Sequence, residues 1–148
     1  MKISTPLMIV TLAVLMCLPA DVVLGQTLAK YLWNNRLLLL FATNSADPTL
    51  NRQLALMQQH EASLKEREIK ILVICPKGSK DCTAGECQDL YDDYHINANI
   101  FSALLIGKDG TEKLRSETTI SPASLFSVID AMPMRREELA RKSKPKGK

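Results

Sequence analysis

One apolar segment stands out in the pattern of hydrophobic and polar positions along the chain. Residues Leu37–Phe41 are apolar without interruption, and the turn-rich segment Thr43–Pro48 follows them. A run without polar alternation is typical of a strand that is buried on both faces, and this one is too short to span a bilayer. The pattern therefore predicts the central strand of a sheet that is covered on both sides.

A helix and a second strand are predicted next. Asp47 and Pro48 are typical of a helix start, because Asp47 can accept hydrogen bonds from the first turn and Pro48 lacks an N–H that would go unpaired there. Apolar residues then recur at helical spacing as far as about Glu66: Leu50, Leu54, Met57 and Leu64. Ile69–Cys75 is a second run, rich in β-branched residues, so the three elements predict a right-handed crossover between parallel strands.

The rest of the chain predicts an antiparallel hairpin and a closing helix. Its elements are expected in this order: an exposed loop over 76–86, a short helix over 88–94, a strand over 100–106, an edge strand over 112–115 and a helix over 121–132. The pair Asp109-Gly110 between the last two strands is a strong hairpin signal. We predict an α/β fold, a three-layer sandwich with a central mixed sheet of about four strands and flanking helices.

Residues 1–25 have the pattern of a secretory signal peptide, with a positive start, an apolar core over 7–18 and small or aliphatic residues up to Gly25. We expect cleavage near Gly25, one domain over 26–134 and a secreted or periplasmic protein. The alternatives are an uncleaved membrane anchor, for which the apolar core is short, and a lipoprotein signal that ends at Cys17. The residue before Cys17 is larger than the small residue expected at such a site.

The positive net charge comes from the C-terminal end of the chain. Residues 26–134 carry 11 Lys and Arg against 13 Asp and Glu, whereas residues 135–148 carry 7 against 2. A domain that is neutral to slightly acidic gives little support to nucleic-acid binding, so we expect none. The C-terminal end lacks apolar periodicity, which predicts a basic disordered tail over 135–148 that could contact anionic surfaces.

Three cysteines follow residue 25, and in an oxidising compartment two of them should pair. Cys82 and Cys87 enclose a short segment that a structural disulfide can close, with Gly85 to ease the turn. Two alternatives are a redox pair, in which Cys87 is an activated thiol resolved by Cys82 or Cys75, and a metal site of Cys82, Cys87 and His95. Cys75, at the end of a buried strand, is the candidate free thiol, either a small core residue or a redox group.

Several segments of the sequence resemble known families. A helix that ends in Tyr94-His95-Ile96, followed by an apolar strand and by Lys108-Asp109-Gly110, resembles the second half of thioredoxins. Further segments are similar to the bacterial family called domain of unknown function 4174: 33–42, 52–56, 107–115 and 129–136. That family is related to a domain of secreted sushi-repeat and matrix proteins of animals. The resemblance implies a thioredoxin-like fold and leaves the activity open.

The sequence departs from thioredoxins where their chemistry takes place. A thioredoxin has Cys-x-x-Cys at the end of the first core strand, where a helix N-terminus lowers the pKa of the attacking thiol. The resemblance assigns other residue types to those positions, namely Asn44, Ser45, Ala46 and Asp47. It also puts Ser102 near the place of the proline that precedes the third strand in thioredoxins. These replacements exclude ordinary thiol–disulfide exchange at that site.

The sequence as a whole favours a non-enzymatic binding or structural module of the cell envelope. We expect a monomer that binds a protein or another envelope component, with no cofactor and no metal. The alternative is a thiol–disulfide redox protein that uses the displaced cysteines Cys82 and Cys87. His60 is expected on a solvent-exposed helix face, and Asp47 is most simply a helix cap.

Overall fold

The computed structural model describes residues 26–144, so the signal peptide expected at 1–25 lies outside the described residues. The helices are α1 (Gln26–Ala29), α2 (Pro48–Gln58), α3 (Glu61–Glu66), α4 (Ala84–Asp93), α5 (Pro122–Asp130) and α6 (Pro133–Ser143). The strands are β1 (Arg36–Phe41), β2 (Ile69–Ile74), β3 (Ser102–Ile106) and β4 (Glu112–Ser116). Over the described range, no helix has both the length and the apolar character needed to cross a membrane.

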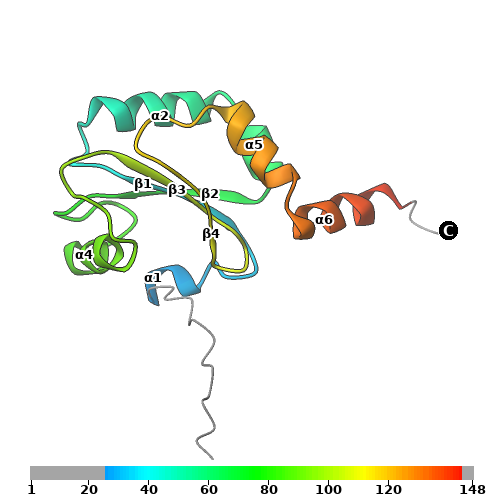
Figure 1. The fold of residues 1–148 in the computed structure, drawn as a ribbon, viewed down its shortest axis with the longest axis horizontal. Coiled ribbons are helices and arrows are strands. Elements are labelled where there is room, and N and C mark those ends of the chain that lie inside the picture. The colour runs from blue at the N-terminus through cyan, green and yellow to red at the C-terminus, as the bar shows by residue number, and fades with distance from the viewer. Residues whose placement is uncertain (1–25, 145–148) are drawn as a thin grey trace, which may run out of the picture.

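The strands form one mixed sheet between two layers of helices. The strand order is β2-β1-β3-β4, with β2 parallel and β3 antiparallel to β1. Figure 1 shows α2 and α5 on one face of the sheet, α1 and α4 on the other face, and α6 beyond one end of the sheet. This arrangement confirms the predicted three-layer α/β sandwich.

The apolar run predicted as the central strand is buried along its whole length. Because successive side chains of a strand point to opposite faces, Leu38 and Leu40 pack in the core beneath α2 and α5, whereas Leu37 and Leu39 pack in the core beneath α4. The strand therefore contributes to two hydrophobic cores, which explains why its sequence shows no polar alternation.

Two helix boundaries differ from the predicted ones. The helix predicted as far as Glu66 is divided into α2 and α3 at His60, although the apolar spacing from Met57 to Leu64 continues across the break. Helix α4 begins before residue 88, because the side chains of Thr83 and Glu86 cap each other's backbone N–H groups in a capping box.

The prediction of a disordered tail from residue 135 is wrong as far as Ser143, because the chain continues as α6. Buried charges attach this helix to the sheet. Arg36, at the start of β1, donates hydrogen bonds to both carboxylate oxygens of Glu138, at 3.1 and 3.3 Å. The ammonium group of Lys108 lies 2.8 Å from the same carboxylate. A segment with the composition of a solvated tail is therefore part of the folded domain.

Arg135 strengthens the attachment of α6. Its side chain is 1 % exposed and forms ion pairs with Glu66 at 2.6 Å and with Asp130 at 3.3 Å. The hydrogen bond from Arg135 is the largest cause that holds the pKa of the Glu66 carboxyl below its ordinary value, and the positive charges of Arg135, Arg67 and Lys142 act in the same direction. Two charges of the segment that the sequence predicts as a disordered tail, Arg135 and Glu138, thus have fixed partners in β1, α3 and α5.

Candidate functional site

The positions to which the resemblance assigns a thioredoxin site lie at the carboxyl ends of β1 and β2. These parallel strands are paired in register as far as Phe41 and Ile74, and the N–H of Ala42 donates to the carbonyl of Ile74 at 3.0 Å. The next residues along the two strands are Thr43, which begins the loop to α2, and Cys75, which begins the loop to α4. The structure therefore brings Cys75 to the same edge of the sheet as the loop that contains Asn44 and Asp47.

The loop between β1 and α2 satisfies its own hydrogen-bonding groups. One carboxylate oxygen of Asp47 accepts hydrogen bonds from the N–H groups of Thr49, at 2.8 Å, and Leu50, at 3.2 Å. The other oxygen accepts a hydrogen bond from the Thr43 hydroxyl at 3.1 Å. The side-chain carbonyl of Asn44 accepts a hydrogen bond from the N–H of Ala46 at 2.8 Å. These contacts confirm Asp47 as the N-cap of α2.

The Asp47 carboxylate lies at a helix N-terminus, which is the kind of place in which a thiolate is stabilised in thioredoxins. Burial favours the neutral acid, but the hydrogen bonds from Leu50, Thr49 and Thr43 outweigh it and lower the pKa of Asp47 below its ordinary value. The side chain is therefore a permanent anion at neutral pH. The N–H groups at the start of α2 could lower the pKa of a thiol at that position, but they already donate to the Asp47 carboxylate.

Tyr91 of α4 fastens the ends of β1 and β2 from the other side of the sheet. Its hydroxyl group lies 2.9 Å from the carbonyl oxygen of Ala42 and 3.1 Å from that of Ile74, and it donates to this pair. Burial first, and then negative charge at Cys75 and Asp47, raise the pKa of Tyr91 to about 12. The phenol thus stays protonated and acts as a structural donor, not as an acid or base.

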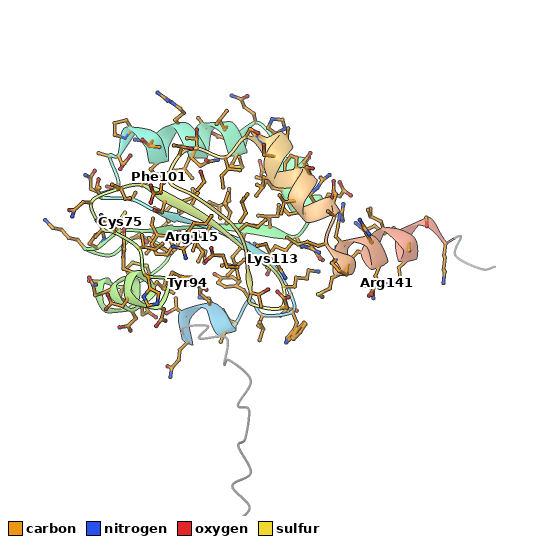
Figure 2. All side chains as sticks on the ribbon, in the orientation of Figure 1. Cys75, Tyr94, Phe101, Lys113, Arg115 and Arg141 are labelled. Carbon is orange, nitrogen blue, oxygen red and sulfur yellow. A yellow bond between two sulfur atoms is a disulfide. The ribbon has the colours of Figure 1, made fainter. Side chains whose placement is uncertain are left out.

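Cys75 is a free thiol, as the sequence suggested, and it is 4 % exposed. Burial raises the pKa of the Cys75 thiol, and the negative charge of Asp47 acts in the same direction. Both effects disfavour the thiolate, which is the reactive form of cysteine. Figure 2 shows Cys75 at the end of the molecule opposite to Arg141 of α6.

Cys82 and Cys87 form a disulfide, with their Cα atoms 5.5 Å apart. Cys87 has no exposed surface and Cys82 has 6 %, so the bond is shielded from thiols in solution. The two sulfurs belong to the core beneath α4, whereas Cys75 belongs to the core on the opposite face of the sheet. The sheet therefore separates Cys75 from the disulfide, and Cys75 cannot act as its resolving thiol in this fold.

The loop before α4 is less exposed than its polar composition predicted. The N–H of Val73 in β2 donates to the Asp81 carboxylate at 2.8 Å, and the Ser79 hydroxyl donates to the carbonyl of Val73 at 2.5 Å. The loop therefore covers the carboxyl end of the outer edge of β2. The disulfide joins the end of this loop to the first turns of α4.

The remaining predicted site positions are dispersed. Asn44, Ser45 and Ala46 are exposed on the loop before α2, and Ser102 is buried at the start of β3, where it is paired with Phe41. His95 lies after α4 with a φ of 52°. In the part of the chain that the structure describes, no group of three His, Cys, Asp or Glu side chains is arranged to hold a metal ion.

The sequence does not predict the contacts of several residues that shape this site. Tyr91 lies where the sequence predicts only a short helix, and the contact of its hydroxyl group depends on tertiary packing. Gln53 of α2 has no exposed surface and exchanges hydrogen bonds with the backbone of Ile120, at 3.0 and 2.6 Å. The spacing of Thr83 and Glu86 could have predicted the start of α4, because a Thr followed three residues later by Glu is the sequence signature of a capping box.

The fold and the site together define a thioredoxin-like module whose helix start is capped by a carboxylate. The structure is similar to that of the reduced 2-Cys peroxiredoxin of Plasmodium vivax, with a TM-score of 0.59 and 13 % sequence identity over 82 % of this chain and 78 % of that chain. The chain belongs to the family described as "Domain of unknown function (DUF4174)", whose model matches residues 27–138.

Curated relatives of the chain are larger animal proteins. It is 29 % identical over 124 residues to the human sushi repeat-containing protein SRPX, and 24 % identical over 123 residues to the mouse sushi repeat-containing protein SRPX2. It is 25 % identical over 138 residues to the coiled-coil domain-containing protein 80 of Danio rerio. These alignments include 78–79 % of this chain but only 27, 26 and 16 % of the respective relatives.

Proposed function

We propose that the chain is a secreted or periplasmic, non-enzymatic module that binds a protein or another component of the cell envelope. The observation that carries this proposal is the Asp47 carboxylate at the start of α2, hydrogen-bonded to the N–H groups of Thr49 and Leu50. A fold related to redox proteins has a fixed anion at the place where they need a reactive thiol. Such a site cannot attack a disulfide, whereas the scaffold around it remains able to bind.

The proposed location outside the reducing cytosol is supported by the disulfide. Structural disulfides persist in oxidising compartments, and the Cys82–Cys87 bond is buried. The similarity to sushi repeat-containing proteins is consistent with this location. The expected leader over 1–25 supports it from the sequence.

Thiol titration combined with an insulin-reduction assay tests the proposal. For a chain that starts at Gln26, we expect no rapidly reacting thiol in the native state, one after denaturation and three after denaturation with a reductant. With dithiothreitol as electron donor, the protein should not accelerate insulin reduction above the background rate. Acceleration comparable to that of a thioredoxin would contradict the proposal.

A matched variant makes a negative result informative. The double substitution Asn44→Cys and Asp47→Cys restores Cys-x-x-Cys at the loop before α2 and frees the N–H groups of Thr49 and Leu50 for a thiolate. We expect this variant to gain insulin-reducing activity. The comparison then assigns the inactivity of the natural sequence to the loop and not to the scaffold.

A redox protein that cycles the Cys82–Cys87 pair is the second candidate. The presence of the bond favours it, but the burial of both sulfurs opposes rapid exchange. The two candidates differ in their equilibrium with glutathione. A bond that is reduced in a glutathione buffer of cytosolic poise, and that reoxidises readily, would support the redox candidate and remove the structural one.

A further inference from the structure

A groove lies along the outer edge of β2. It consists of two adjoining hollows of ≈ 320 and ≈ 530 Å³ that share Glu61, Leu64 and Ile71 in their linings. The floor is apolar and is made by α2, α3 and β2, with Leu54, Leu64 and Ile71 among its residues. We call this surface the β2-edge groove.

The backbone of β2 has open hydrogen-bonding groups along this groove. The carbonyls of Glu68 and Ile74 accept hydrogen bonds from the N–H groups of Arg36 and Ala42. In a parallel pair, the N–H and C=O groups of the even-numbered residues between them therefore point toward β1, and those of the odd-numbered residues point outward. Val73 faces outward and is covered by Ser79 and Asp81. The N–H and C=O groups of Ile69 and Ile71 point outward as well, and over residues 26–144 they have no hydrogen-bond partner.

The charges around the groove are mainly positive. The exposed side chains of Lys65, Lys70 and Lys80 line it and form no ion pair with any described residue. Glu68 is neutralised by its ion pair with Lys108. That leaves Glu61 as the one acidic side chain of the lining without an ion pair inside the described range.

We propose that the β2-edge groove binds an extended acidic segment of another protein, which pairs with Ile69 and Ile71 as an additional strand of the sheet. Successive side chains of such a strand point to opposite faces. One set, if apolar, enters the groove over Leu64, and the other set, if acidic, lies on the face of the sheet that carries Lys70. Backbone pairing then supplies affinity, and the alternating pattern supplies selectivity. This inference rests on the proposed function as a binding module and names the class of its partner.

A second copy of the chain fits this edge poorly. Antiparallel pairing of two β2 edges about a two-fold axis would bring Lys70 of each chain close together, and like charges opposite each other destabilise paired strands. The loop that covers Val73 also shortens the open edge to Ile69 and Ile71. The open edge is too short for a stable pair of β2 strands, but a peptide can add contacts in the groove.

Amide hydrogen exchange and NMR titration test the proposal on the chain that starts at Gln26. The probe is a synthetic peptide of alternating Val and Glu with blocked termini. Without the peptide, the Ile69 and Ile71 amides should exchange faster than the Lys70 and Leu72 amides, because the latter bond to β1. At saturation, the Ile71 amide should become protected, with shift changes confined to the groove.

Two peptide controls separate strand addition from nonspecific attraction. A peptide of the same composition with Val and Glu in separate blocks should bind at least tenfold more weakly. The alternating peptide with N-methylated backbone amides should also lose on the order of tenfold in affinity, because the hydrogen bonds to the Ile71 carbonyl are removed. Equal binding of the N-methylated peptide would overturn strand addition.

Protein variants test the positions. Lys70→Glu should weaken binding several-fold, because Lys70 lies on the face that receives the acidic side chains, and Lys80→Glu, on the apolar side of the groove, should weaken it less. Lys77→Glu, on the same loop as Lys80 but outside the groove, should have no effect. Equal effects of all three variants would reduce the interaction to general charge attraction and contradict the proposed site.

Other occupants of the edge would also overturn the proposal. Protection of the Ile71 amide that rises with protein concentration would identify a second copy as the occupant. Protection that disappears when residues 145–148 are deleted would identify the chain's own C-terminus. If the peptide does not bind and insulin is not reduced, the groove proposal is wrong and the proposed function stands. Insulin reduction with peptide binding intact would instead remove the proposed function and retain the groove.

Discussion

At the scale of single residues, one feature of a helix start serves two kinds of chemistry. The first N–H groups of a helix have no partner within it, and the helix dipole adds positive potential there. A thiolate placed at that point becomes reactive, whereas a carboxylate becomes a fixed structural group. Asp47 is the second kind, with both carboxylate oxygens engaged by Thr43, Thr49 and Leu50.

Replacement of Asp47 tests the strength of this cap. Asp47→Ala leaves two N–H groups at the start of α2 without their acceptor, and we expect a loss of about 1 to 2 kcal/mol in the free energy of unfolding. Asp47→Asn keeps an acceptor oxygen and should retain most of that stability at neutral pH. Urea denaturation of the two variants and the natural sequence measures the difference. Equal stability of Asp47→Ala would show that the cap contributes nothing.

The pH dependence follows from the lowered pKa of Asp47 in the folded state. A lowered pKa means that the stabilisation is complete above the pKa of the unfolded chain and is lost as the pH falls through the lower folded value. The stability difference between the natural sequence and Asp47→Asn should therefore be largest above about pH 5 and should shrink toward pH 3. Urea titrations at several pH values measure this trend.

At the scale of elements, the attachment of α6 depends on one buried carboxylate. Glu138→Gln leaves the buried guanidinium of Arg36 and the ammonium of Lys108 with a weaker, neutral acceptor. We expect a loss of about 2 to 3 kcal/mol, because hydrogen bonds to charged groups are among the stronger ones. Thermal and urea unfolding measure it.

The neighbouring Glu137 provides the control, since it is exposed and forms no ion pair within the described residues. Glu137→Gln should change the free energy of unfolding by less than about 0.5 kcal/mol. A similar loss in both variants would mean that general charge, and not the contact with Arg36 and Lys108, determines the effect.

Burial would raise the pKa of Glu138, but hydrogen bonds from Lys108 and Arg36 outweigh it and lower that pKa.

The helix α6 also marks the limit of what the sequence pattern predicts. Strands β1, β2 and β3, the cap at Asp47 and the hairpin after β3 each depend on local residue types, and all of them were predictable. The position of α6 depends on contacts with Arg36 and Lys108, which are far away in the sequence. A segment with few apolar residues carries no local sign of such partners.

The candidate site was predictable to a similar degree. The absence of cysteine at positions 44–47 and the Cys82–Cys87 pair could be inferred from residue types and spacing. The side of the sheet on which each sulfur lies could not, because it depends on the alternation along β2 and on the packing of α4. The contacts of Tyr91 with two strand ends likewise require the assembled fold.

The disulfide should stabilise the loop before α4 more than the whole domain. The bond closes a short loop, with a sequence separation of 5. Cys82→Ala with Cys87→Ala should therefore lower the free energy of unfolding by about 2 kcal/mol, because the unfolded chain regains the entropy of that loop. We expect the Val73 amide, which donates to Asp81, to exchange much faster in this variant, while amides of β1 change little. Unchanged exchange at Val73 would show that the loop holds its place without the bond.

At the scale of the whole molecule, exposed basic side chains lie at the end that α6 forms. Arg141 and Lys142 are exposed on α6, at the end of the molecule opposite to Cys75 (Figure 2), and three of the six residues that follow in the sequence are Lys. A cluster of this kind can bring one end of the protein to an anionic surface, at about 1 kcal/mol for each charge.

Vesicle binding tests this orientation without disturbing the buried Arg135. Arg141→Gln with Lys142→Gln should reduce partitioning onto phosphatidylserine-containing vesicles by on the order of tenfold or more at low salt. Lys77→Gln with Lys80→Gln, in the loop after Cys75, should reduce it far less. Both differences should vanish near 1 M salt, where charges are screened beyond about 3 Å. Equal effects of the two pairs would argue against a preferred end.

The contact of Ser79 and Asp81 with Val73 has a practical consequence for handling the protein. An uncovered edge strand is a template for aggregation, and the loop that covers part of this edge is tethered to α4 by the disulfide. Refolding in the presence of a strong reductant, which keeps the bond from forming, is therefore expected to give a turbid sample. Expression in an oxidising host compartment, with storage free of dithiothreitol, should keep the preparation clear.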